Sequence, residues 1–254
     1  MRAQQGSALI AVMFILLLIS LLGALAIRQG LTSLNIATNS QVNALLFQSA
    51  DSLFAKLEQA TNIEGAALGS MQNPIIFAAT TAIDGNEIFI CHRPLTDAAV
   101  AKDSNNATTV DPDEVGNGAT SVDGRGTGYC DLTKDFNSAR RAVVSQVAVM
   151  VPQDGAQDYA PFEFAPRKTD DDGAKIDEVK RIRTYITSML PSLSDADLSA
   201  VQSECIENRS NDNMDTENQG SETLLDCLAR YGVPAKTQVQ EYQLTTLFQQ
   251  RVLK

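Results

Sequence analysis

The sequence predicts an α+β protein, and three features of the 254-residue chain indicate this class. The chain starts with an uncharged run, Ser7 to Ile27, that continues into an amphipathic helix. Short runs rich in valine and isoleucine follow it, and such runs are typical of strands. Helix-start signals recur in a later segment, about residues 170–232. We therefore expect a long N-terminal helix, a few short strands and an inserted helical lobe.

The uncharged run is long enough to be a membrane-spanning helix. Residues 8–27 contain no charged side chain, and about 20 helical residues match a hydrocarbon thickness of about 30 Å. The alternative is a cleavable secretory signal peptide, but its apolar core has only about 7–15 residues. Arg2 precedes the run and Arg28 follows it, so these charges say little about its orientation. We expect a membrane anchor over residues 8–27.

The same helix is expected to continue beyond the anchor. No proline or glycine occurs from Leu31 to Glu58. Apolar residues recur there at the spacing of an amphipathic helix: Leu31, Leu34, Val42, Leu46, Ala50, Leu53 and Leu57. The N-terminal helix is therefore predicted over residues 7–58, with its second half belonging to the core of a globular domain.

Several runs in the rest of the chain read as strands. The clearest are Glu87–Cys91 and the valine-rich run Arg141–Val151, while Tyr159–Ala165 is weaker and Thr237–Phe248 fits a strand or a short helix. The Gly/Asp/Asn-rich segment Thr96–Gly128 ends in GRGTGYC. This run lacks the preceding strand and following helix of a phosphate-binding loop. We predict a flexible surface loop there.

The inserted lobe is predicted to contain three helices. Lys175–Leu190 has apolar residues at helical spacing and is followed by Pro191. Ser194–Glu207 begins with Ser-Asp-Ala-Asp, an N-cap signature, and Ser221–Tyr231 has a similar start at Ser221. The lobe is therefore expected over about residues 170–232.

Four cysteines all lie beyond the apolar run: Cys91, Cys130, Cys205 and Cys227. An even number is most simply explained by two disulfides in an oxidising compartment, which would place this part of the chain outside the cytoplasm. Three pairings are possible, and closeness in sequence favours Cys91 with Cys130 and Cys205 with Cys227. The alternative, a four-thiolate zinc site, is disfavoured because the chain has no CxxC pair.

The sequence offers little for catalysis or cofactor binding. The formal charge of −11 disfavours nucleic acid as a partner. The single histidine, His92, has no matched nucleophile, so we expect a surface residue at a strand end. An EF-hand-like rhythm occurs at Asn211, Asn213, Asp215, Glu217 and Glu222, but Thr216 stands where the loop needs glycine. We favour a solvated loop over calcium, and we predict no enzyme activity, no metal and no cofactor.

The N-terminal sequence resembles a known family. Gly6 ends a short leader and is followed by the small residue Ser7, an apolar stretch and a continuous amphipathic helix. This arrangement is similar to the class III signal of type IV pilins and pseudopilins. The segment QQGSALIAVMFILLLISLLGALAIRQGLTSLNIATNSQVNALLFQSADS resembles the PilX-type minor pilins, with Gly-Ser-Ala-Leu, a late Leu-Leu-Gly and a Ser/Asn/Gln-rich helix. The resemblance covers about the first 58 residues and is weak beyond them.

The resemblance implies how the chain is processed. In this family a prepilin peptidase cuts after the glycine, here Gly6, and methylates the new terminal amine, here that of Ser7. Most pilins carry glutamate at the fifth residue after the cut, the position important for assembly, whereas this chain has Ala11. Residues 1–6 are thus expected to be a leader, and residues 59–254 a globular domain.

The resemblance also implies a fold, a location and partners. A pilin-like protein packs its long N-terminal helix on a small antiparallel sheet. Before assembly such a subunit is anchored in the inner membrane with its C-terminal domain in the periplasm. It is then incorporated into a type IV pilus, here at or near the tip. The expected partners are other minor pilins, the major pilin, the prepilin peptidase, the inner-membrane pilus assembly platform and the membrane, without nucleic acid.

Two alternatives share the same N-terminal features. A minor pseudopilin of type II secretion uses the same kind of signal, and the sequence does not separate it from a pilus subunit. A membrane-anchored periplasmic binding protein or enzyme is the more distant alternative. It would need convergent polar residues for a pocket, and no such set is evident in the sequence.

Overall fold

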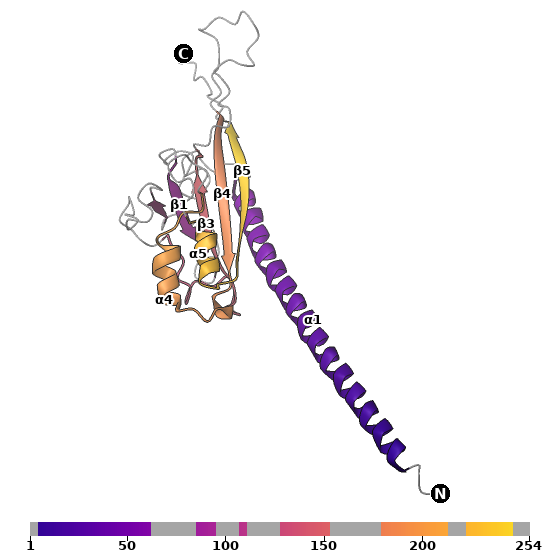
Figure 1. Ribbon diagram of the computed structural model, residues 1–254. Coiled ribbons are helices and arrows are strands. Elements are labelled where there is room, and N and C mark those ends of the chain that lie inside the picture. The colour runs from indigo at the N-terminus through magenta and orange to yellow at the C-terminus, as the bar shows by residue number, and fades with distance from the viewer. Residues whose placement is uncertain are drawn as a thin grey trace, which may run out of the picture. The chain divides into compact units, whose positions relative to one another are not determined.

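A computed structural model describes residues 5–61, 85–94, 107–110, 128–152, 179–212 and 222–245 (Figure 1). The chain divides into two units, Met1–Leu45 and Leu46–Lys254. The predicted strand Tyr159–Ala165 lies outside the described residues.

The long N-terminal helix is present. Helix α1 runs from Gln5 to Thr61, in agreement with the predicted range 7–58. The predicted apolar stripe divides into two parts. Leu31 and Leu34 are exposed, whereas the residues from Leu46 onward are buried in the second unit: Leu46, Ala50, Leu53, Phe54 and Leu57.

The second unit contains a five-stranded, entirely antiparallel sheet (Figure 1). The strand order is β2-β1-β3-β4-β5. The strands are β1 Glu87–Cys91, β2 Thr108–Val110, β3 Val144–Met150, β4 Val179–Met189 and β5 Ala235–Thr245. Strands β1 and β3 agree with the sequence predictions, and the terminal run is a strand rather than a helix. Together, α1 and this sheet make an α+β fold.

The prediction of a helix over Lys175–Leu190 is wrong, because β4 occupies most of this range. Ile182 and Ile186 lie four residues apart, a spacing that places two side chains on one face of either a helix or a strand. The segment is rich in β-branched residues, which favour strands. Pairing with β3 on one side and β5 on the other fixes β4 as a central strand. The helical lobe therefore starts later than predicted.

The prediction of a flexible surface loop over Thr96–Gly128 is also wrong at the points that the structure describes. Strand β2 lies inside this range and pairs with β1. Gly128, at its end, is buried, and its N–H donates to Thr108 Oγ1 over 2.9 Å. A Cβ at this position would collide with Thr108 N and Phe89 O. Glycine is required here because three backbone segments meet closely.

The two faces of the sheet bury different neighbours. One face, with Ile88, Val147 and Ile186, packs against the buried residues of α1 around Leu53 and Leu57. The opposite face packs against the helical lobe and the segment around residue 132. Since both faces are covered, all seven residues of β3 are buried.

The helical lobe lies between β4 and β5 in sequence. Its described residues contain a short 3-10 helix and three further helical segments: η3 Pro191–Leu193, α4 Leu198–Val201, the π-helical turn η4 Gln202–Ile206 and α5 Leu224–Arg230. The helix predicted to begin at Ser194 begins later, at Leu198, and its N-cap is Asp197, the last residue of the predicted Ser-Asp-Ala-Asp signature, whose side chain accepts from Ser199 N. Helix α5 is capped by Thr223, two residues after the predicted Ser221.

Candidate functional site

The first unit presents an apolar helical surface, formed by residues 9–27 of α1, which we call the apolar segment. Its large side chains are 44% to 70% exposed, from Leu18 to Ile10. Among the described residues, α1 is the one helix long and apolar enough to cross a membrane, with a mean hydropathy of 3.0 in its best window. Arg28 is the first charged residue after the segment.

Water is an unfavourable environment for this surface. Each Å² of apolar surface removed from water contributes about 25 cal/mol, and nearly every side chain of the apolar segment is apolar. Ser20 is the polar exception, and its hydroxyl donates to Leu17 O over 2.9 Å, which satisfies it inside the helix. The segment is therefore suited to lipid, or to a layer of neighbouring apolar helices.

The helix becomes polar after the apolar segment, while its polar side chains remain bonded to their own backbone. Thr32 donates to Arg28 O over 3.0 Å and Thr38 donates to Leu34 O over 2.9 Å. Because these hydroxyl groups are already satisfied, this part of α1 can lie in water or against another protein without leaving them unpaired.

The residues predicted to be processed lie at the start of α1. The helix begins at Gln5, so Gly6 and Ser7 are in its first turn, while residues 1–4 of the leader are outside the described residues. Ala11 lies about one turn after Ser7, since an α-helix has about 3.6 residues per turn, and it is exposed. Cleavage after Gly6 and methylation of Ser7 remain predictions.

The structure pairs the four cysteines as their spacing favoured. Cys91 bonds Cys130 with a Cα–Cα distance of 4.8 Å, and Cys205 bonds Cys227 with 5.5 Å. No cysteine is free. The first disulfide joins the end of β1 to the segment before β3, and the second joins η4 to α5 within the lobe.

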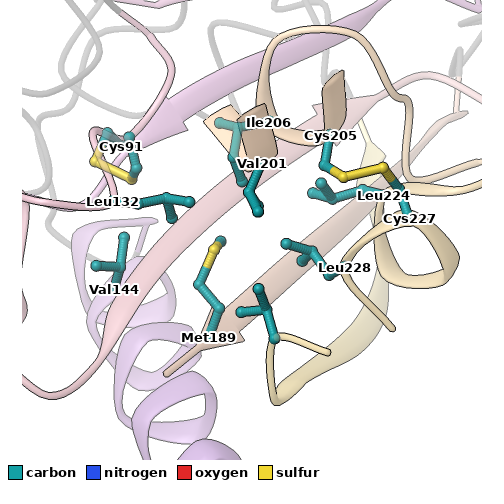
Figure 2. Close-up of a cluster of buried hydrophobic side chains, with 12 residues drawn as sticks. Cys91, Leu132, Val144, Met189, Val201, Cys205, Ile206, Leu224, Cys227 and Leu228 are labelled. Carbon is teal, nitrogen blue, oxygen red and sulfur yellow. A yellow bond between two sulfur atoms is a disulfide. The ribbon is translucent and has the colours of Figure 1, made fainter. Parts of the chain in front are cut away.

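Both disulfides belong to one buried cluster, which the sequence did not predict (Figure 2). Met189 at the end of β4 and Leu228 of α5 are in the same cluster, and both are fully buried. Figure 2 shows the two disulfides on opposite sides of the aliphatic side chains that join the sheet to the lobe. The cluster is therefore one apolar core that joins the lobe, with its Cys205–Cys227 disulfide, to the end of β1, with its Cys91–Cys130 disulfide.

A buried carboxyl group in the sheet accepts hydrogen bonds from the lobe. Glu87 of β1 is fully buried, and its Oε1 accepts from Asn211 N over 3.0 Å and from Asp212 N over 2.9 Å. Burial raises the pKa of Glu87 to about 7, although its hydrogen bonds with Asn211 and Asp212 act in the opposite direction. The sequence shows Glu87 only as the first residue of a strand, so its burial could not be predicted.

A buried ion network lies beside Glu87. Arg183 Nη1 lies 2.9 Å from Asp212 Oδ2, and both side chains are less than 10% exposed. The same guanidinium contacts Glu241 Oε1 of β5, with Nη2 at 2.6 Å. Arg183 thus connects the lobe turn at Asp212 to the edge strand. The pairing of β4 with β5 brings Arg183 and Glu241 together, since the two residues are direct partners in the register.

The described ends of the EF-hand-like run already have protein partners. Asn211 Oδ1 accepts from Thr187 Oγ1 over 3.0 Å, and Glu222 accepts from Arg209 and Arg230. Residues 213–221 lie outside the described residues. No group of three or more histidine, cysteine and acidic side chains that could hold a metal occurs in the part of the chain that the structure describes. The prediction of a solvated loop is wrong at the Asn211 end, because Asn211 bonds Thr187 and Glu87 and lies between the buried residues Ser210 and Asp212.

The prediction that His92 is a surface residue is wrong. Its side chain is only 4% exposed. The residue directly follows β1, and its N–H donates to Ser145 O over 3.2 Å, which continues the β1–β3 pairing. The burial of His92 could not be predicted, because the sequence does not show that other residues cover the end of β1.

No protein-family model, no curated protein and no solved structure matches this chain.

Proposed function

We propose that this chain is a PilX-like minor pilin, a non-enzymatic structural subunit that helps to initiate type IV pili and is incorporated at or near their tips. Before assembly it is held in the inner membrane by residues 8–27, with its C-terminal domain in the periplasm. Its partners are other minor pilins, the major pilin, the prepilin peptidase and the assembly platform.

The observation that carries this proposal is the change of surface along α1. Leu16 is 61% exposed, whereas Leu57 on the same helix is fully buried against the sheet. A filament subunit needs both properties in one helix. The exposed part must leave lipid and pack against the helices of neighbouring subunits. The buried part must hold the folded domain on the outside of the filament.

The two disulfides support the proposed location. Disulfides persist in oxidising compartments such as the bacterial periplasm and cell surface, and both pairs lie in the part of the chain that follows the anchor. The antiparallel sheet packed on the second half of α1 is compatible with a pilin-like fold.

Ala11 supports a position at the end of a filament. A carboxylate in an apolar environment costs about 2.5–3.5 kcal/mol unless it is paired. The glutamate that most pilins carry here can pair with the terminal amine of a neighbouring subunit. A subunit at the very end lacks one such neighbour, so an apolar residue at this position avoids an unpaired buried charge.

Gene deletion tests the assembly role. Cells that lack this chain should show a large loss of surface pili by electron microscopy, and re-expression of the wild-type chain should restore them. Re-expression of Gly6→Val should not restore them, because the peptidase requires a small residue before the cut. Normal pilus numbers in the deletion strain, at wild-type pilin levels, would contradict a role in initiation.

Gold labelling tests the tip position. An epitope tag after Lys254 should be labelled at pilus ends and should be absent from most of the shaft. Regular labelling along whole shafts, at a density like that of the major pilin, would contradict it.

A further inference from the structure

One end of the sheet carries an exposed basic and apolar surface. At this end β3 begins, β4 ends and β5 begins, since Val144, Met189 and Ala235 are paired across the three strands. The exposed or half-buried residues next to this end come from four separate segments, and together we call them the basal surface: Phe47, Arg140, Arg141, Leu193 and Lys236.

The basal surface combines two large apolar side chains with cations. Phe47 of α1 is 50% exposed, and Leu193, which follows the end of β4, is 56% exposed. Lys236 Nζ lies 5.2 Å from the centre of the Phe47 ring, within the range of a cation–π contact. Exposed apolar side chains close to charged groups are typical of a protein interaction site.

Arg140 and Arg141 differ from the other described arginines of the second unit. Arg93, Arg209 and Arg230 each pair with an acidic side chain. Neither Arg140 nor Arg141 forms an ion pair with any residue that the structure describes, and both are exposed. Two adjacent guanidinium groups without an acidic partner among the described residues are unexpected in a chain of net charge −11.

Hydrogen bonds to α1 and β3 hold the turn that carries the two arginines. Asn137 Nδ2 donates to Ser49 Oγ of α1 over 2.9 Å and to Ser145 Oγ of β3 over 2.7 Å. Asn137 N also donates to Val143 O over 2.8 Å, which closes the turn. Arg141 has φ = 48°, and among the described residues it is the only one other than glycine with positive φ. A non-glycine residue keeps this conformation only where its surroundings impose it.

We propose that the basal surface docks on an acidic face of the globular domain of a second pilin-type subunit, with Arg140 and Arg141 pairing with its carboxylates. This inference rests on the proposed function. Charge complementarity selects the partner, because exposed guanidinium groups attract acidic surfaces and repel basic ones. Phe47 and Leu193 then supply the apolar contact beside the ion pairs.

Photo-cross-linking in cells tests the docking. A benzophenone amino acid is placed at Ala139, which is exposed in the same turn, in the full-length chain expressed in its host. The cross-linked peptides are identified by mass spectrometry. The charge is reversed with Arg140→Glu together with Arg141→Glu, and kept with Arg140→Lys together with Arg141→Lys. Lys56→Glu, at an exposed position elsewhere on α1, serves as the control for reversal of a single charge away from the basal surface.

The expected product joins Ala139 to an acidic segment of a second protein that carries its own apolar N-terminal helix. Its yield should fall at least tenfold in the double glutamate variant and should persist in the double lysine variant and in Lys56→Glu. Intact Cys91–Cys130 and Cys205–Cys227 disulfides would show that the glutamate variant is folded.

Three results would overturn the docking proposal: no product, an unchanged yield in the double glutamate variant, or a product on a segment without carboxylates. A partner without an apolar N-terminal helix would also contradict it. Failure of the proposed function is detected separately, because the pilus count in the deletion strain does not depend on where Ala139 cross-links.

Discussion

The two units of the chain use the same residue types in opposite ways. Leu16 in the apolar segment is 61% exposed, while Leu53 in the second unit is 2% exposed. Arg28 is the only charged residue from 9 to 45, whereas the second unit buries Glu87, Arg183 and Asp212 in its interior. The second unit is stabilised by its own contacts. The first unit has an interaction surface that needs lipid or other helices, which is the property that a filament subunit requires.

The largest loss of stability is expected from a substitution in the buried ion network of the second unit. Arg183→Ala should lower the free energy of unfolding of the second unit by about 3–5 kcal/mol, because it leaves the buried Asp212 carboxylate without its cation. Arg140→Ala removes an exposed arginine and should change it by no more than about 0.5 kcal/mol. Urea unfolding in detergent, followed by tyrosine fluorescence, measures both, since every tyrosine lies beyond residue 61. Equal midpoints for the two variants would contradict the burial of Arg183.

A matched pair of leucine substitutions tests the comparison directly. Leu57→Ala should lower the free energy of unfolding by about 2–5 kcal/mol, because it leaves a cavity between α1 and the sheet. Leu16→Ala should change the same transition by less than about 0.5 kcal/mol, because its side chain is 61% exposed and belongs to the first unit. A comparable loss in both variants would mean that the apolar segment belongs to the folded core.

The stability of the second unit should depend on pH through Glu87. Its pKa is raised to about 7 from the ordinary 4.5, so the folded state holds a proton that the unfolded chain releases. The free energy of unfolding should therefore be highest below pH 4.5 and fall by up to about 3 kcal/mol as the pH rises to 7. Glu87→Gln should flatten this dependence. The same slope in both proteins, measured by urea unfolding between pH 4.5 and 7, would exclude Glu87 as its source.

The smallest effect is expected at a helix cap. Thr223→Ala should cost about 1 kcal/mol, because the Thr223 side chain accepts from Asp226 N at the start of α5. Thr38→Ala in the first unit removes a hydroxyl that only bonds its own helix, so the unfolding of the second unit should not change. Thermal unfolding of both variants provides the measurement, and an unshifted midpoint for Thr223→Ala would show that the cap contributes nothing.

The elements with one clear periodicity could be predicted from the sequence. The uncharged run and the stripe from Leu46 to Leu57 predicted α1, and the valine-rich run predicted β3. The cysteine spacing also favoured the two disulfides that form. In each case the local pattern and the tertiary contacts agree, which is typical of natural sequences.

The errors occurred where tertiary pairing decides between two local possibilities. Ile182 and Ile186 fit a helix as well as a strand, and only pairing with β3 and β5 selects β4. The contact of Glu87 with Asn211 and Asp212 joins segments more than a hundred residues apart, so no local pattern reports it. Strand β2 has only three residues and lies in a glycine-rich segment, so no strand pattern could be recognised there.

The N-terminus of the mature protein tests the central claim most directly. Intact-mass and peptide analysis of protein taken from the membrane should give a chain that begins at Ser7 with a methylated amine, and Gly6→Val should retain the leader and be correspondingly heavier. The peptidase of the pilin family produces this end, and a secretory signal peptidase does not. A mature chain that still begins at Met1, or one cut near Ala26 at the end of the apolar segment, would contradict the proposal that this protein is a pilin.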